Sequence, residues 1–345
     1  MQKRIEFLDL AKGICIILVV VFHMTNYYHV SMPAADFFKS FRLPLYFFLS
    51  GLFFKSYSGF SDFFVRKVNK LLVPFLFWYL LLSVLVPYLL FQLFGISFSE
   101  KNMNITFVDC LLNFYVNENF PNAPLWFLLC LFEVNILFFA TMLIVQSFFN
   151  DSTWAICIMA LLVGLFGISL YFMGVNLPMY LDSSLSALPF FVFGFYIKRR
   201  TTFLEKHSWD KYAILFAIVL FALVYILARH YSLKFNIYPS LLNAVLMYPC
   251  GFMGTIAIIL IAKTLKHLPL VTYWGRYSIM ILVSHVMVLK VFAPVVARLG
   301  LDNVWEKCAI NLILTLLSYL LIIPFMKKFM PHVTAQKDVI PVNKN

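Results

Sequence analysis

Charged side chains are scarce in this sequence: they make up 12% of its 345 residues, and only 15 residues are acidic. Apolar residues make up 63%, whereas an ordinary soluble domain is about half apolar and about a quarter charged. A soluble core of this size cannot hide so many Phe, Leu and Ile side chains from water. The composition therefore excludes a soluble enzyme, a nucleic-acid-binding protein and a disordered chain.

The sequence also lacks the spacings that bind metals or form disulfide frameworks. Its six cysteines make no Cys-x-x-Cys pair and no Cys/His ligand pattern, and five of them lie within apolar runs. Cysteine in such surroundings usually serves as a small apolar residue. We therefore predict neither a metal site nor a set of disulfides. There is also no internal repeat, no low-complexity segment and no stretch polar enough to form a soluble domain.

Long apolar runs are what the sequence has instead. A helix needs about 20 apolar residues to cross a bilayer, and fewer where it is short or bent. We identify ten such runs: 8–28, 42–55, 72–94, 124–148, 154–174, 185–198, 212–229, 240–262, 277–297 and 305–326. The prediction is an all-α integral membrane protein, a bundle of about ten transmembrane helices. Residues 1–330 form this domain, and the polar tail 331–345 is expected to fray.

The distribution of basic residues predicts how the bundle is oriented. Ten spans place 19 of the 27 Lys and Arg residues on one side of the membrane and 8 on the other. Basic residues gather on the cytoplasmic side, so both termini are predicted to be cytoplasmic, in a multi-pass protein of the cell membrane. The net charge of +12 is then a matter of topology and of contact with membrane lipids, and it does not indicate nucleic-acid binding.

The first span carries polar residues that a membrane helix rarely tolerates. Asp9, Lys12, His23 and Asn26 fall on one face at 100° per residue. Ionisable groups inside a span are costly and mark candidate functional sites. Helix–helix contact, with Asp9 and Lys12 as a simple ion pair, is the alternative. His23 lies deep in the span and can exchange a proton near neutral pH, so it is a candidate base.

Three further spans or loops add candidates. Trp126 and Glu133, seven residues apart, share one face of the fourth span, and the predicted depth of Glu133 resembles that of His23. His285 lies inside the ninth span, where a structural hydrogen bond and a chemical role are both open. Arg66, Lys67 and Lys70 make an inner loop basic. This loop suits either the phosphates of an anionic cofactor or contact with lipid headgroups.

Five stretches, in order along the chain, resemble motifs of the acyltransferase 3 family of ten-span membrane acyltransferases. They are Lys12-Gly13 with His23 after ten residues, Leu43–Gly51, Lys67-x-x-Lys70 before Pro74, Trp126-Phe127-Leu128, and Gly275-x-x-Ser278 followed by His285. Lysine replaces the family's usual arginine at Lys12, Lys67 and Lys70. Charge is kept, but the bidentate grip of arginine on phosphate is lost.

The resemblance implies transfer of an acyl group, usually acetyl from acetyl-CoA, to a carbohydrate hydroxyl at the outer membrane face. Acetyl-CoA would be the donor, with its phosphates near Lys67 and Lys70 and with Arg66 and Lys12 as further basic groups. His23 would act as general base or carry the acetyl group, and Glu133 or Asp9 would orient its imidazole. The other expected substrate contacts are Trp126, whose ring could stack on a sugar, Arg42, whose charge could stabilise developing negative charge, and His285.

Two other classes of protein fit the same polar residues. Buried charges inside a helical bundle also suit a transporter or flippase for an envelope lipid or glycan. Against it, the two halves of the chain show no repeat and no matching broken spans. A non-catalytic membrane partner of an envelope assembly is the third hypothesis, because likeness of fold does not fix function.

Overall fold

The molecule is a bundle of helices. The computed structural model describes residues 5–32, 35–94, 107–116, 122–150 and 152–342. Within these ranges nine helical segments are long and apolar enough to cross a membrane, and there is no β-strand, only one isolated bridge between Lys234 and Ile237. The prediction of an all-α, multi-span membrane protein is confirmed.

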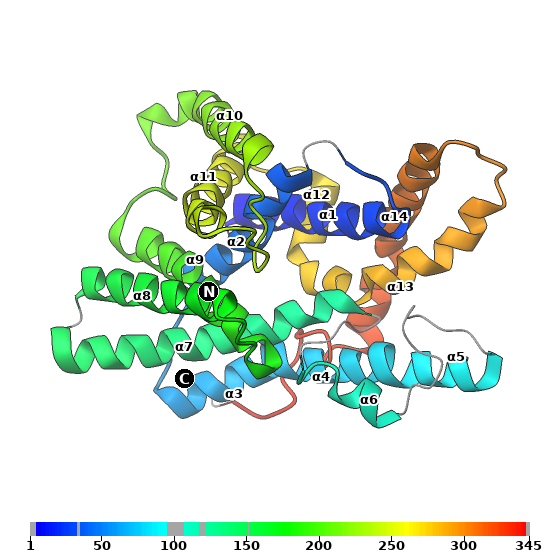
Figure 1. Cartoon of the computed structure of the whole chain (residues 1–345), viewed down its shortest axis with the longest axis horizontal. Coiled ribbons are helices and arrows are strands. Elements are labelled where there is room, and N and C mark those ends of the chain that lie inside the picture. The colour runs from blue at the N-terminus through cyan, green and yellow to red at the C-terminus, as the bar shows by residue number, and fades with distance from the viewer. Residues whose placement is uncertain (1–4, 33–34, 95–106, 117–121, 151, 343–345) are drawn as a thin grey trace.

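The helices follow the predicted spans closely (Figure 1). Their bounds, in order, are α1 Glu6–Tyr27, α2 Ala35–Leu52, α3 Phe60–Lys67, α4 Val73–Tyr79, α5 Val86–Phe94, α6 Phe107–Leu112, α7 Trp126–Phe149, α8 Thr153–Phe172, α9 Leu181–Arg200, α10 Ala213–His230, α11 Leu241–Leu265, α12 Pro269–Arg276, α13 Ser278–Ala297 and α14 Val304–Phe329. Two π-helical turns, Val68–Leu72 and Leu80–Leu85, join α3, α4 and α5 into one run. Most of the predicted outer connection 95–123 lies outside the described residues.

The predicted second span is α2, which is not one of the nine apolar helices. It has 18 residues and carries Asp36, Lys39 and Arg42 towards its start, together with Pro44 inside it. At about 1.5 Å per residue it is about 27 Å long, close to the thickness of the hydrocarbon core. It packs against α9 and α11 inside the bundle. Arg42 is buried in this packing, whereas Asp36 and Lys39 are partly exposed. The three charged residues explain why a count based on hydropathy and charge misses this helix.

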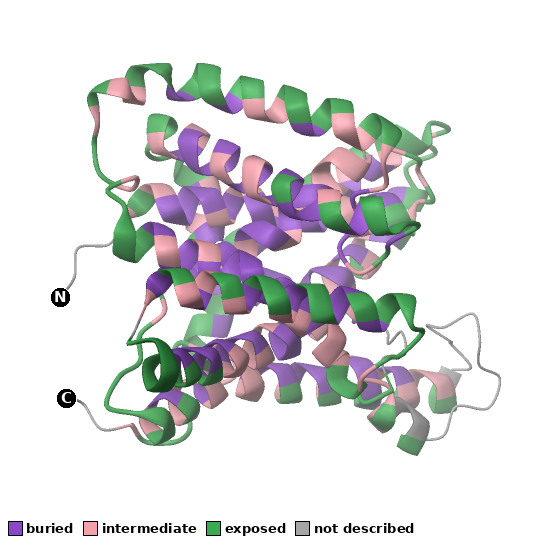
Figure 2. Cartoon of the chain, turned by 60° about the vertical axis from the view of Figure 1, so that its left-hand side comes forward, coloured by how far each residue is buried: buried purple, intermediate pink, exposed green. Residues whose placement is uncertain are grey.

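Burial separates central helices from peripheral ones (Figure 2). In the most apolar stretch of α9, 72% of the residues are buried, against 17% in α10. Close backbone approach makes the central packing tight. A Cβ on Gly51 of α2 would lie 1.9 Å from the carbonyl oxygen of Phe191 in α9, and a Cβ on Gly194 would lie 2.0 Å from that of Phe48. These glycines let α2 and α9 pack backbone to backbone.

The C-terminal segment 331–342 is attached to the bundle, and the expectation that it frays is wrong. The Asn69 side chain, fully buried, donates to the Ile340 carbonyl at 2.8 Å and accepts from the Val339 and Ile340 amides at 3.0 and 2.9 Å. The Trp78 indole donates to the Val333 carbonyl at 2.9 Å. A polar composition did not reveal this attachment, because its partners lie about 270 residues away.

Asn69→Ala is expected to release this segment. The substitution removes three hydrogen bonds and leaves backbone groups unpaired, at a cost of about 1–3 kcal/mol. Lys70→Ala is the comparison variant, since it removes two exposed contacts to the same segment, with Asp338 and with the Ala335 carbonyl. An exposed ion pair is worth about 1 kcal/mol or less, so Lys70→Ala should release the segment less than Asn69→Ala does. Thermal unfolding and limited proteolysis of the purified protein measure both effects. Equal protection of residues 331–342 in Asn69→Ala and in the unmutated protein would contradict the attachment.

Both ends of the described chain lie at one end of the bundle. Asp9, near the start of α1, lies 3.8 Å from Arg276 at the end of α12, and Lys327, near the end of α14, donates to Tyr277 at 2.9 Å. At the other end, Asn311 of α14 donates to Tyr28 just after α1, also at 2.9 Å. A chain whose two ends lie at the same end of the bundle crosses it an even number of times, which agrees with the ten predicted spans.

We expect residues 56–71, 199–211 and 263–276 to face the cytoplasm, because basic residues concentrate there. Single cysteines introduced at positions 58 and 206, in a variant without the native cysteines, should react with a membrane-impermeant maleimide only in opened cells. A cysteine at position 302 should react in intact cells. Labelling at 206 in intact cells would reverse the orientation.

Candidate active site

His23, Arg42 and Trp126, three of the candidates from the sequence, line one cavity. It has a volume of about 80 Å³ and lies where α1, α2, α7 and α13 meet. We call it the histidine cavity. Its other lining residues are mostly apolar: Val19, Phe22, Leu43, Tyr46, Pro124, Phe127 and Leu282. A mostly apolar lining with a few convergent polar groups is the usual character of a ligand site.

His23 and His285 lie side by side, although they come from α1 and α13. Their ring centroids are 5.2 Å apart. His23 is half-buried and His285 fully buried. The Nδ1 of His285 lies 2.8 Å from the Ile281 carbonyl and 3.0 Å from that of Leu282. Since carbonyls only accept, Nδ1 carries the proton and Nε2 of the neutral ring is an acceptor. No described residue bonds to that Nε2.

Arg42 brings a buried positive charge to the cavity. The residue is only 8% exposed, and its guanidinium carbon lies 3.9 Å from the centre of the Phe22 ring. Its Nε has no hydrogen-bond partner among the described residues, and none of them forms an ion pair with Arg42. Burial of an uncompensated charge is costly. The cavity is therefore electropositive and suited to a group that carries negative charge.

Trp126 is the first residue of α7 and is partly buried. Its ring lies 5.5 Å from the ring of Tyr180, at the start of α9. The indole is thus held at the edge of the cavity by a second aromatic ring, which suits it to stack on a flat apolar face such as that of a sugar. No motif in the sequence pointed to Tyr180, which ends the short 3-10 turn Pro178–Tyr180 and has a left-handed backbone (φ 66°).

Asp9 is not placed to orient the His23 imidazole. It lies fourteen residues before His23 in α1, which is about 21 Å along the helix axis. Its carboxylate is buried and lies 3.8 Å from the Arg276 guanidinium. The prediction of Asp9 as an orienting acid is wrong, because a stripe along one helix face brings residues to one side of the helix without making them neighbours.

Glu133 accepts a hydrogen bond of 2.7 Å from Ser184 of α9, whose hydroxyl also lies 3.2 Å from the Cys130 carbonyl. It lies seven residues beyond Trp126, about 10 Å further along α7, and it does not line the histidine cavity. The structure therefore gives it a role in joining α7 to α9. The predicted similarity of depth did not bring Glu133 to His23.

The basic candidates on the other side of the bundle are mostly paired within the protein. Arg66 binds Asp62 at 2.8 Å, and Lys70 binds Asp338 and the Ala335 carbonyl, both at 3.0 Å. Lys67 is half-buried, 5.4 Å from the centre of the Phe63 ring, and has no ion pair with a described residue. A π-helical turn begins directly after Lys67. Arg66 and Lys70 are thus not free phosphate ligands, whereas Lys67 is available.

Lys12 lies far from His23 along α1, about 16 Å for eleven residues. Its ammonium is 4.6 Å from the centre of the Phe53 ring, so it does not reach the charge that develops at His23. Tyr46 connects the two regions. Its ring lines the histidine cavity, and its hydroxyl lies 3.5 Å from the Lys12 carbonyl oxygen.

Comparison with known proteins decides between the classes of protein that the sequence left open. Residues 5–326 match the acyltransferase 3 family, which is described as an acyltransferase domain. The chain belongs to this family. No curated protein and no solved structure matches this acyltransferase. The family and the multi-span helical fold make it a membrane acyltransferase, and they do not support the transporter or a non-catalytic partner.

Two of the family-like motifs of the acyltransferase meet where α1 crosses α12. A Cβ on Gly275 would lie 1.8 Å from the Asp9 carbonyl oxygen, and one on Gly13 would lie 1.9 Å from that of Val271. Only glycine allows backbones to approach so closely. Lys12-Gly13 and Gly275-Arg276 are therefore two sides of one contact, which the linear sequence cannot show.

Proposed function

We propose that this acyltransferase moves an acetyl group from cytosolic acetyl-CoA to a carbohydrate hydroxyl on the outer side of the cell membrane. His23 would act as general base or as acyl carrier. The observation that supports this most directly is the histidine cavity, where an imidazole, a buried cation and an aromatic ring converge. His23 lies four residues before the end of α1, which is the outer end if the N-terminus is cytoplasmic.

In the direct route, a nitrogen of His23 takes the proton from the sugar hydroxyl while the oxygen attacks the thioester carbonyl. The carbon–sulfur bond breaks, and the CoA thiolate takes the proton from the imidazolium. In the covalent route, a nitrogen of His23 attacks the carbonyl, and CoA leaves as a thiolate that takes the proton of the other ring nitrogen. The sugar hydroxyl then attacks the acetyl-imidazole, the carbon–nitrogen bond breaks, and the released imidazole takes the hydroxyl proton. Both routes need an unprotonated nitrogen on His23. His285, whose ring centroid lies 5.2 Å from that of His23, would help to position the imidazole by packing against it.

The donor would approach from the cytoplasmic side. The adenine nucleotide part of acetyl-CoA would stay at the cytoplasmic end of the bundle, and its narrow pantetheine arm would reach into the bundle towards His23. Of the three basic residues Arg66, Lys67 and Lys70, Lys67 is the one that has no ion pair with a described residue, so it is the favoured phosphate contact.

Lys67→Ala is expected to raise the KM for acetyl-CoA about fivefold, because one half-exposed charge pair contributes about 1 kcal/mol. Lys70→Ala should change this KM less, since Asp338 already balances the Lys70 charge. Initial rates at varied acetyl-CoA concentration, with the acceptor held constant, measure both values. A larger effect on the KM for Lys70→Ala than for Lys67→Ala would contradict Lys67 as the phosphate contact. It would indicate instead that the phosphates bind near Lys70, on the face covered by residues 331–342.

Release of the CoA thiol by the purified protein in detergent tests the proposed function. Micelles have no compartments, so a transporter gives no signal. The protein should release free thiol from acetyl-CoA when an envelope glycan fraction is added, and the acetyl group should be recovered as an ester on the glycan. Thiol release that is independent of glycan, with only acetate as product, would contradict a carbohydrate acceptor.

A further inference from the structure

Two more cavities adjoin the histidine cavity and form a row with it. The second, of about 140 Å³, shares Phe22 and Arg42 with the histidine cavity. The third, of about 420 Å³, shares Ser31, Met32, Ala35 and Lys39 with the second, and it is also lined by exposed Arg229 of α10. We call these three the cavity row. It leads from the outer end of α10, past α2, to His23.

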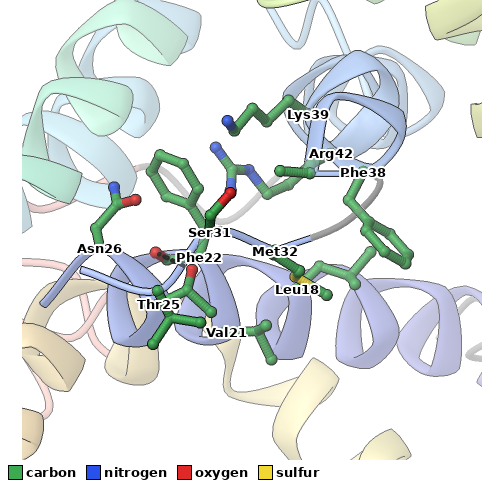
Figure 3. Close-up of a pocket in the computed structure, with 12 residues that line it drawn as sticks. Leu18, Val21, Phe22, Thr25, Asn26, Ser31, Met32, Phe38, Lys39 and Arg42 are labelled. Carbon is green, nitrogen blue, oxygen red and sulfur yellow. Dashed lines mark hydrogen bonds between the residues drawn. The ribbon is translucent and has the colours of Figure 1, made fainter. Parts of the chain in front are cut away.

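Positive charge lines the cavity row along its whole length. Arg229, Lys39 and Arg42 come in that order towards His23. Figure 3 shows Lys39 and Arg42 extending in the same direction from α2, across the segment that carries Ser31. Asp36 is the acidic residue lining the row, and it is already engaged by Lys39 at 3.3 Å and by Lys234 at 4.0 Å. The net charge of the row is therefore positive.

Arg42 is a buried cation that has no compensating negative charge among the described residues. Buried charges are normally paired, yet the described chain offers the Arg42 guanidinium only the face of Phe22. Its Nε is buried and unpartnered, and the side chain lines both the second cavity and the histidine cavity. An anion at this point would compensate the charge and would lie next to the imidazole that acts on the acceptor.

We propose that the cavity row binds the acceptor by an anionic group, a phosphate or carboxylate carried on or beside the sugar that is acetylated. Arg42 binds this anion, Lys39 and Arg229 attract it from outside, and Trp126 contacts the sugar. The acceptor class is thus an acidic glycan, and neutral sugars are poor acceptors. This inference rests on the proposed function for the identity of the reacting hydroxyl, but the binding of an anion can be measured without any reaction.

Calorimetric titration of the full-length protein in a neutral detergent, at constant ionic strength and without acetyl-CoA, tests the proposal. The probes are glucose 1-phosphate, glucuronate and glucose. Both anionic sugars are expected to bind about tenfold more tightly than glucose, a ratio that one charge-assisted contact provides. Arg42→Gln should abolish the preference, and Arg42→Lys should keep part of it. Equal binding of the three probes to the unmutated protein would overturn the proposal.

Surface variants keep the test decisive if Arg42→Gln does not fold. Arg229→Gln should weaken glucose 1-phosphate binding about two- to threefold, since it removes one exposed charge. Arg298→Gln is the matched control, because Arg298 is an exposed residue on the same side and lines none of the three cavities. Equal effects of these two variants would overturn the proposal.

A lipid headgroup carries the same phosphate chemistry, so one arm of the experiment separates the two sources. Phosphatidylglycerol added to the micelles should not displace glucose 1-phosphate. Displacement would assign the cavity row to a lipid and overturn the acceptor proposal. Anion binding that depends on Arg42, in a protein without acetyl transfer, would instead contradict the proposed function and leave the anion site in place.

Discussion

His23→Gln is expected to lower acetyl transfer by about 10²–10⁴-fold, the range that a general base typically supplies. Glutamine keeps most of the size of the imidazole and a hydrogen-bonding group, but it can neither accept a proton nor carry an acetyl group. His23 is half-buried in the histidine cavity, so the variant should fold and insert normally. The measurement is the rate of acetyl ester formation on glycan, together with the thermal unfolding of the purified variant.

Two other histidines calibrate this result. His29 is exposed beyond the end of α1 and lines none of the three cavities, so His29→Gln should keep nearly full activity. His285→Gln should lose part of the activity, because the His285 ring packs beside that of His23, with the ring centroids 5.2 Å apart. If His23→Gln retained more than about a tenth of the activity, the lost barrier stabilisation would be under about 1.4 kcal/mol. That is too little for a base or an acyl carrier.

Gly275→Ala is expected to prevent stable folding. The added carbon would lie 1.8 Å from the Asp9 carbonyl oxygen and 2.5 Å from the Gly13 amide nitrogen. Backbone atoms cannot turn away as side chains do, so α1 and α12 must separate and the Asp9–Arg276 contact is lost. Overpacking of a core typically lowers the free energy of unfolding by about 1–3 kcal/mol. A clash between backbone atoms should cost at least the upper value of this range. The fraction of monodisperse protein after extraction and the unfolding temperature measure the loss.

The sign of this effect is diagnostic. In an unconstrained helix, alanine is more favourable than glycine by about 1 kcal/mol, so a stabilised Gly275→Ala variant would show that the helices are not in contact. Ala140→Leu is the control. Ala140 is exposed on α7, where added carbon faces lipid, and the variant should extract and unfold like the unmutated protein.

Much of the fold could be predicted from hydropathy and helix length, since most predicted spans correspond to helices within a few residues. Three features escaped. The helix α2 begins at Ala35, seven residues before the predicted span 42–55, because its first turns carry charged residues. The run from Phe60 to Phe94 begins twelve residues before the predicted span 72–94, because its first turns are amphipathic. Attachment of residues 331–342 depends on the buried side chain of Asn69, and no local pattern signals a contact between such distant parts of the chain.

The site was predictable in part. His23, Arg42, Trp126 and His285 were candidates from the sequence, and three-dimensional packing brings them together. Asp9 failed because position on a helix face says nothing about separation along the axis. The prediction that Glu133 orients the His23 imidazole rested on an agreement in depth alone. Its hydrogen-bond partner in the structure is Ser184 of α9, and the sequence did not reveal how α9 packs.

Tyr46 lines the histidine cavity, although it was not among the candidates from the sequence. It lies in the Leu43–Gly51 stretch that resembles a family motif, but no pattern in the sequence singled it out as a site residue. The structure places its ring in the histidine cavity and its hydroxyl beside the Lys12 carbonyl. A single sequence gives no way to choose this aromatic residue among the 64 in the chain, which combine 40 Phe, 18 Tyr and 6 Trp.

Labelling of glycan in sealed membrane vesicles tests the central claim most directly. Right-side-out vesicles are loaded with radiolabelled acetyl-CoA and contain either the unmutated protein or His23→Gln at equal amounts. The account predicts that alkali-labile label appears on carbohydrate at the outer surface of the first vesicles, and that it falls to background in the second. Equal labelling of the glycan in both, or label that stays inside as acetyl-CoA in both, would contradict it.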